Sequence, residues 1–305
     1  TPSISSAASD VYKRQDSQSQ VGRVNKYTAY ALLGKVLLYQ DKFAEAASAL
    51  DNVIGVYSLV SDYGSQFLRF GENGPESVFE IQYSNQSNWY DWGCAHCSEG
   101  NYAIIMNGPR GWSGPEYAQG WSFNVPTAEF YNSFEEGDTR RDATILDIEA
   151  FAAATGANYT EGYDHTGYFN NKYIPRAGES GGQTELNYLT NFRIIRYSDV
   201  LLMAAEAYNR GGLDDGLAQE FLNQVRRRAF GDDDHDISAS GSALTDAIWE
   251  ERKFELSLEG HRFFDLVRTG RASSTIAGFV EGKHEVFPIP QQEVDISGLT
   301  QNAGY

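Results

Sequence analysis

Helical periodicity is the feature that most constrains the fold of this chain. In one stretch, apolar and small residues recur at alternating steps of three and four, at Val24, Tyr27, Ala31, Gly34 and Leu38. After a polar break at residues 40–42, a second set follows at Phe43, Ala46, Ala47, Leu50 and Val53. Residues three and four apart share one face of a helix, so each set predicts a helix with one apolar face. Two such helices joined by a short break predict a helical hairpin.

A second hairpin is predicted between residues 193 and 228. Its first helix has Ile194, Leu201, Ala205 and Tyr208 on one face, and its second has Ala218, Phe221, Leu222 and Val225. Gly211 and Gly212 mark the break between them. In the first hairpin, tetratricopeptide spacing is met by Tyr30, Leu33, Gly34, Ala46 and Leu50. The sequence therefore predicts a mainly α fold with a tetratricopeptide-like scaffold of helical hairpins.

A third helical region, after Leu244, carries carboxylates where apolar residues are expected. Glu251 and Glu255 fall on the stripe that includes Ile248 and Leu258. Because a buried carboxylate without a partner is strongly unfavourable, we expect both to join a partly buried ion-pair network with a structural role. The nearest candidate partners in sequence are Arg252, Arg262 and Arg268, and Arg196 could reach in from another helix. A catalytic pair of carboxylates would instead have to face one cavity at a defined separation.

The composition narrows the class of ligand. The 305 residues include 24 basic and 42 acidic ones, which gives a formal net charge of −18. Nucleic acid and anionic lipid surfaces are disfavoured as partners by repulsion, whereas a neutral ligand suits this field. The hydrophobic content of 41% is sufficient for a sizeable core. The sequence has no run of 18 or more apolar residues and so predicts no membrane-spanning helix.

Helical periodicity is lost between Tyr83 and Trp121, where aromatic residues are frequent. Four of the five tryptophans lie here, namely Trp89, Trp92, Trp112 and Trp121. A long irregular insertion on a helical scaffold is usually functional. Sugars have flat C–H faces edged by hydroxyl groups, so a sugar site needs exposed aromatic planes beside amide or charged groups. The insertion offers such groups at Asn85, Gln86, Asn88, Asp91, Asn101, Asn107 and Arg110.

Within this insertion, about residues 83–125, we expect ligand contacts from Trp89, Tyr90, Trp92 and Trp112, with Asn88 and Asp91 as polar partners. The stretch around the first three rings is too polar to be buried whole. The alternative is that the rings pack on the helices as satellite core, as large aromatic residues do by default. Trp121 and Phe123 are assigned to packing, because Pro126 and Thr127 after them open a helix.

Several motifs of the chain resemble signatures of the SusD/RagB family. Residues 247–270, which include His261-Arg262-Phe263-Phe264-Asp265-Leu266, resemble the C-terminal signature of that family together with residues 287–293 and 301–305. Residues 137–144 and 191–208 resemble two further family motifs, and all stand in family order. The resemblance covers about Val24 to Tyr305. It departs from the family pattern at Ser297-Gly298 and Ala303, which concerns the terminal loop alone.

This resemblance implies a SusD-like domain over residues 21–305, with the ligand-binding insertion at about 83–125. Members of the family are surface lipoproteins that capture glycans for a TonB-dependent, SusC-like transporter in the outer membrane of Bacteroidetes. It therefore implies glycan binding without bond cleavage, a location at the cell surface through a lipid anchor, and no cofactor. Members carry an N-terminal portion that this chain lacks, so we expect a truncated chain. Residues 1–20 have no helical or strand period and are expected to be a disordered or non-native tail.

Cys94 and Cys97 are the two cysteines of the chain. A structural zinc site would need further ligands, and a redox pair would need a strand-to-helix context. The extracellular location that the resemblance implies favours a disulfide, with free thiols as the alternative. The acidic run at 232–236 could bind calcium but lacks the EF-hand pattern, so we read it as a solvated loop and expect no metal site.

Two other classes of function stand as alternatives, the first because some members of the resembled family serve peptide or other nutrient uptake. One is a helical protein- or peptide-binding module of a nutrient-uptake complex, in which the aromatic insertion contacts a protein. The other is a hydrolase. The sequence has no Ser-His-Asp order and no nucleophile elbow, and its five histidines are scattered, so we do not expect an enzyme.

Overall fold

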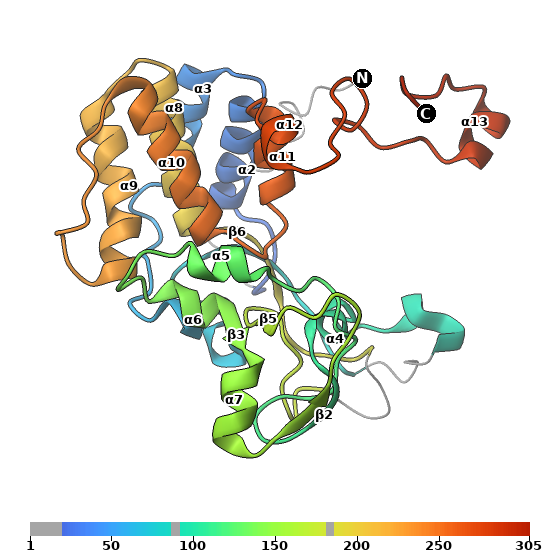
Figure 1. The fold of residues 1–305 in the computed structure, drawn as a ribbon. Helices are drawn as coiled ribbons and strands as arrows, with labels where there is room; N and C mark the ends of the chain where they lie inside the picture. The colour runs from blue at the N-terminus through green and yellow to red at the C-terminus, as the bar shows by residue number, and fades with distance from the viewer. Residues whose placement is uncertain (1–19, 87–91, 181–185) are drawn as a thin grey trace. The chain divides into compact units, whose positions relative to one another are not determined.

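The computed structural model describes residues 20–86, 92–180 and 186–305, and the chain folds into two units, Thr1–Leu258 and Glu259–Tyr305. The expectation that residues 21–305 form one domain stays a prediction. The frame of the first unit is built from the helices α2 (Lys26–Tyr39), α3 (Phe43–Leu50), α8 (Tyr197–Arg210), α9 (Asp215–Phe230) and α10 (Gly241–Glu255). These five helices lie together, and α8 contacts each of the other four (Figure 1). The prediction of a mainly helical scaffold is confirmed.

The first hairpin, α2 and α3, forms as its spacing predicts. Asn25 caps α2 by accepting a hydrogen bond from the backbone N–H of Thr28, and Asp41, with φ of 54°, makes the turn to α3. A Cβ placed on Gly34 would lie 2.5 Å from Cγ of Leu50, which is fully buried in α3. Only glycine therefore allows this approach of the two helices, as tetratricopeptide spacing requires.

The second hairpin, α8 and α9, starts later than the sequence predicts. Ile194 is not in a helix but in β6 (Phe192–Arg196), which pairs antiparallel with β1 (Ser77–Ile81). The β-branched pair Ile194-Ile195 fits a strand better than a helix, and α8 begins only at Tyr197. Asp214 then caps α9, and Gly231, with φ of 84°, ends it.

Shorter elements form the rest of the first unit, around the aromatic insertion. The helices are α4 (Ala103–Asn107), α5 (Ala128–Asn132), α6 (Arg140–Thr144) and α7 (Ile148–Thr155), with 3₁₀ turns at Tyr63–Phe67, Arg69–Gly71 and Trp92–Cys97. The strands are β2 (Arg110–Ser113), β3 (Ile145–Asp147), β4 (Asn158–Thr160) and β5 (Tyr168–Asn170), paired antiparallel as β2 with β4 and β3 with β5. Thr127 caps α5 through the N–H of Phe130, where the sequence predicts a helix start.

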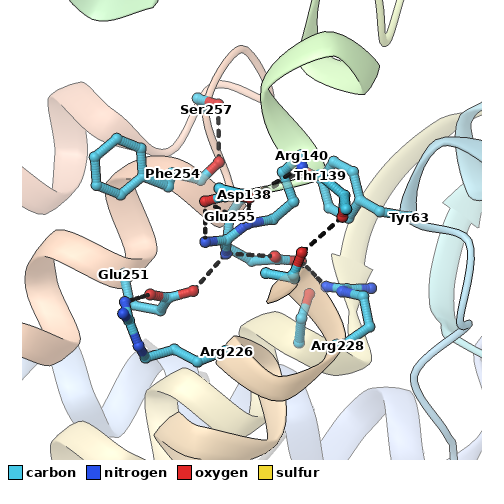
Figure 2. A network of polar contacts seen from close by, with 12 residues as sticks. Tyr63, Asp138, Thr139, Arg140, Arg226, Arg228, Glu251, Phe254, Glu255 and Ser257 are labelled. Carbon is cyan, nitrogen blue, oxygen red and sulfur yellow. Dashed lines mark hydrogen bonds and ion pairs between the residues drawn. The ribbon is translucent and has the colours of Figure 1, made fainter. Parts of the chain in front are cut away.

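A buried ion-pair network joins the helical frame to these shorter elements (Figure 2). Glu255, at the end of α10, is fully buried and accepts hydrogen bonds from Arg140 of α6 at 3.1 Å, Arg196 of β6 at 2.8 Å and Arg228 of α9 at 2.6 Å. Glu251, one turn earlier, pairs with Arg140 and, at 3.0 Å, with Arg226. The expected structural network is therefore present.

The arginine partners are only partly those that the sequence suggests. Arg196 does bind Glu255, but the neighbour Arg252 pairs with Asp199 of α8 at 2.7 Å instead. Arg252 directly follows Glu251 in the helix. Neighbours in sequence do not share a helix face, so Arg252 points away from the face that carries Glu251 and Glu255. Arg268 pairs with Asp265 at 2.8 Å within the second unit.

The network determines the charge state of Glu255. Burial alone would raise the pKa of this carboxyl, but the charges of Arg228, Arg196 and Arg140 outweigh burial and hold the pKa well below its ordinary value. The pKa of Arg140 is raised, because its acidic neighbours, Glu251 first, outweigh its own burial. Both groups are thus charged at neutral pH, and neither is free to exchange protons as a catalytic acid or base.

The second unit contains α11 (Arg262–Arg268), α12 (Ala272–Thr275) and α13 (Gln291–Ser297). Its two terminal motifs are bound to each other. The amide of Gln301 donates to the carbonyl oxygen of Ile289 at 2.7 Å and accepts from its N–H at 2.8 Å, and the hydroxyl of Tyr305 donates to the carbonyl oxygen of Val286 at 3.0 Å. Ser297, Gly298 and Ala303, which depart from the family pattern, therefore do not prevent these hydrogen bonds between the two motifs.

We expect the same substitution to have opposite effects at two helical glycines. Gly34→Ala should destabilise the protein by about 1 kcal/mol or more, because its new methyl group overlaps Leu50. Gly216→Ala, on the exposed side of α9, should be neutral or stabilising by up to about 1 kcal/mol, since alanine favours helix. Urea unfolding of both variants measures this, and equal effects would contradict the close approach.

Glu255→Gln should destabilise the protein at pH 7 by about 3–5 kcal/mol, because three buried arginines lose one charged partner. A carboxyl whose folded pKa is depressed stabilises the fold above its unfolded pKa of about 4.3, and this stabilisation is lost as the pH falls toward the folded value. The gap between parent and variant should therefore narrow below about pH 4.

Urea unfolding at pH 7 and at a series of lower pH values measures that gap. Glu250→Gln is the matched control, because Glu250 lies on the same helix with a half-exposed carboxylate paired to Lys253. It should change stability little at either pH. A Glu255→Gln variant as stable as this control would show that the network does not hold the fold.

Candidate functional site

The aromatic insertion is described from residue 92 onward. Asn88, Trp89, Tyr90 and Asp91 lie outside the described residues, as does the side chain of Trp92, so the prediction that these residues bind ligand stays a prediction. The backbone of Trp92–Cys97 forms a 3₁₀ turn, within which a disulfide joins Cys94 and Cys97. The bridge closes a loop of four residues directly after the predicted ligand stretch.

Trp112 lies in β2 with its side chain directed into the structure. Its exposed fraction is 8%, and its ring contacts Tyr117 and Phe151, each at a centroid distance of 5.9 Å. Its flanking residues Gly111 and Ser113 are exposed, as the alternation of a half-buried strand requires. This placement favours packing, the alternative given for these rings, and leaves Trp112 without an open ring face for a sugar.

The surroundings of Trp112 form a small hydrophobic core of their own. It includes Tyr117, Ile148 and Phe169, which come from three separate segments. Burial, with a contribution from the nearby carboxylate of Glu116, raises the pKa of Tyr117 to about 12. The described part of the insertion is therefore partly packed, because Trp112 and Tyr117 belong to this core.

Trp121 and Phe123 differ from each other, although packing is predicted for both. Trp121 is half-buried and packs on the core that contains Ile104 and Ile105, as predicted. The packing prediction is wrong for Phe123, which is 52% exposed. Its neighbours Ser122 and Asn124 have positive φ values of 59° and 52°, so the ring stands in a tightly turned segment.

Among three of the polar residues expected to face a ligand, two are buried in structural hydrogen bonds and one is exposed. Asn101 and Asn107 are buried and their amide groups donate to backbone carbonyl oxygens, of Thr190 and of Ala103 and Tyr173 respectively. They hold the loops together rather than face a ligand. Arg110 is exposed, and its Nε donates to the carbonyl oxygen of Trp121 at 2.8 Å.

The exposed aromatic residue Tyr163 was missed in the sequence. Its exposed fraction is 90%, and it follows β4, which pairs with β2 through Arg110 and Thr160. This pairing brings the segment after Thr160 to the insertion, although Thr160 stands 50 residues after Arg110 in the chain. A lone tyrosine beyond the predicted insertion gives no signal of this placement.

The described part of the chain shows neither a candidate metal site nor a candidate membrane-spanning helix. Residues 20–86, 92–180 and 186–305 include no group of three or more His, Cys, Asp or Glu side chains placed to hold a metal ion. Over the same residues, no helix combines the length and the apolar character needed to cross a membrane.

The helical-hairpin frame with its aromatic, irregular insertion matches the fold of a known protein family. The sequence profile of the SusD family matches residues 75–284. The chain therefore belongs to the SusD family. It is 29% identical to SusD-like protein P2 of Formosa agariphila over 95% of its own length, and spans 61% of that relative.

Solved structures of the same fold are closely similar. The chain matches a laminarin-binding SusD-like protein with a TM-score of 0.87 and 38% identity, covering 99% of this chain and 67% of that one. It matches surface glycan-binding protein A from Bacteroides thetaiotaomicron, in complex with laminarihexaose, with a TM-score of 0.87 and 32% identity, covering 98% and 69%. Both names describe binding, and neither describes an enzymatic activity.

We expect the unreduced protein to show no free thiol in denaturant, because Cys94 and Cys97 are bonded to each other. After reduction, two thiols per chain should react with a chromogenic disulfide reagent. Two reactive thiols before reduction would instead show that the free-thiol alternative holds in solution.

Proposed function

We propose that this protein captures a neutral glucan of the laminarin type at the cell surface, without cleaving it. The observation that carries the proposal is the match to a laminarin-binding structure at 38% identity over 99% of the chain. A neutral glucan also suits a chain with a net charge of −18, which repels anionic ligands. Aromatic faces supply apolar contact with the sugar rings, and amide and charged groups set their orientation.

On this proposal, the stretch at 88–92 is one part of the binding surface. Trp89, Tyr90 and Trp92 supply ring planes, and Asn88 and Asp91 supply hydrogen bonds. Its position next to the Cys94–Cys97 bridge supports this role, because a closed turn restricts the backbone that directly follows the stretch. Trp112 belongs to the packing beneath the surface.

The proposed role continues with delivery of the glycan to a TonB-dependent outer-membrane transporter, with the protein held at the surface by a lipid anchor in its longer form. Membership of the SusD family supports this step. Co-purification from the source membrane tests it, since a stable complex should retain a large β-barrel partner. A peptide-binding module of the same complex is the alternative, and it would bind peptide but no glycan.

Trp89→Ala with Trp92→Ala should weaken the retardation of the protein in laminarin-containing native gels by about tenfold in apparent affinity, because two ring contacts are lost. Tyr39→Ala, which removes an exposed ring of α2, is the control and should migrate as the parent does. Parent protein that is not retarded by any neutral polysaccharide would contradict glycan capture. Release of reducing ends from laminarin would contradict a binding role without cleavage.

A further inference from the structure

Two exposed aromatic side chains stand on adjoining loops outside the predicted ligand stretch. Phe123 is 52% exposed and Tyr163 is 90% exposed. A Cβ placed on Gly162, the neighbour of Tyr163, would lie 2.8 Å from Cβ of Ser122, the neighbour of Phe123. The two loops therefore touch at these backbones, and each carries a large ring next to the point of contact.

Arg110 and β4 hold the contact between the Ser122 and Gly162 loops in place. The backbone N–H of Arg110 donates to the hydroxyl of Ser122 at 3.1 Å, and Arg110 pairs with Thr160, two residues before Gly162. Both loops thus start from the same short sheet, β2 with β4. Because a sheet edge is more rigid than a free loop, the rings are presented from a defined base.

Phe123 is held on one side by its neighbours. The guanidinium of Arg110 lies 5.9 Å from the centroid of its ring, and the ring of Trp121 meets it edge-on at 6.3 Å with an interplanar angle of 78°. An edge contact from Trp121 leaves much of Phe123 in solvent, in agreement with its exposed fraction. The ring is supported but not covered.

The backbone of both loops is strained where the rings emerge. Ser122 and Asn124 on one loop, and Asp164 on the other, adopt positive φ values of 59°, 52° and 53°. Each such residue, being other than glycine, costs roughly 1 kcal/mol and persists when the surrounding structure imposes it. Phe123 and Tyr163 stand beside these residues and are exposed, so burial of the rings offers no compensating stabilisation.

Polar groups border the two rings. Asn124, Glu161 and Asp164 are exposed, and the amide of Asn124 donates to Oδ1 of Asn107 at 3.2 Å, which limits its motion. Exposed carboxylate and amide groups beside an aromatic plane match the hydroxyl edge and the C–H face of a sugar ring. The same carboxylates oppose an anionic ligand.

We propose that Phe123 and Tyr163, with Arg110, Asn124 and Asp164 at their border, form a sugar-stacking surface that binds a segment of the neutral glucan. This assignment rests on the proposed function and adds a contact surface that is independent of residues 88–92. A chain-like ligand that contacts both surfaces binds more tightly than a short one, because two joined contacts raise the affinity.

Isothermal titration of laminarihexaose and of laminarin tests the assignment with Phe123→Ala, Tyr163→Ala and the double variant. Each single variant should weaken laminarin binding by about threefold, and the double variant by about tenfold or more, since each substitution removes one ring contact with the sugar. Phe123→Trp should restore or exceed parental binding. Tyr39→Ala removes an exposed ring of α2, outside the insertion, and should have no effect.

The outcomes separate the two proposals. A double variant that melts at the parental temperature and binds laminarin as the parent does would overturn this surface while leaving glycan capture intact. Loss of binding in Trp89→Ala with Trp92→Ala, together with full binding in the double variant, would confine the site to residues 88–92. Parent protein that binds neither laminarin nor laminarihexaose would overturn both proposals.

Discussion

The carboxylate of Glu255 is the point on which most of the first unit depends. Its three arginine partners come from α6, β6 and α9, so one buried charge holds four elements together. Two of these partners, Arg140 and Arg228, are shown in Figure 2. Such a centre is stable only when complete, because each charge left alone in the interior costs several kcal/mol, about 3–5 by measurement on other proteins. The network therefore favours one arrangement of the helices over looser alternatives and takes no part in chemistry.

This frame matters for the proposed binding because it positions the loops. Arg140 lies at the start of α6, and β3 follows that helix. Further along the same segment, β4 pairs with β2 of the aromatic insertion. Rings that stand on loops are useful for stacking only when the loops are held in place. The packed core around Trp112 and Tyr117 supplies that support from within the insertion, and the junction of Ser122 with Gly162 supplies it at the surface.

Much of the helical frame could be predicted from the sequence, because apolar spacing and the small Gly34 are local signals. The position of Glu251 and Glu255 on an apolar stripe is a local signal too, and it predicts that both need partners. It does not predict that Arg140 and Arg228 are the partners, since 115 and 27 residues separate them from Glu255. The sequence predicts Ile194 in a helix, whereas it lies in β6, because its strand partner, β1, is distant in sequence. The exposure of Phe123 depends on positive φ values at Ser122 and Asn124, which residue type alone does not indicate.

Amide hydrogen exchange in Arg140→Met tests most directly whether the Glu255 network joins the frame to the loops. Methionine keeps much of the volume of the arginine stem and removes its charge. The account predicts at least about tenfold faster exchange in α6, β3 and β5, with α2 and α3 protected as in the parent, because local opening follows local loss of contacts. Unchanged exchange in α6, β3 and β5, or an equal increase in all helices, would contradict it.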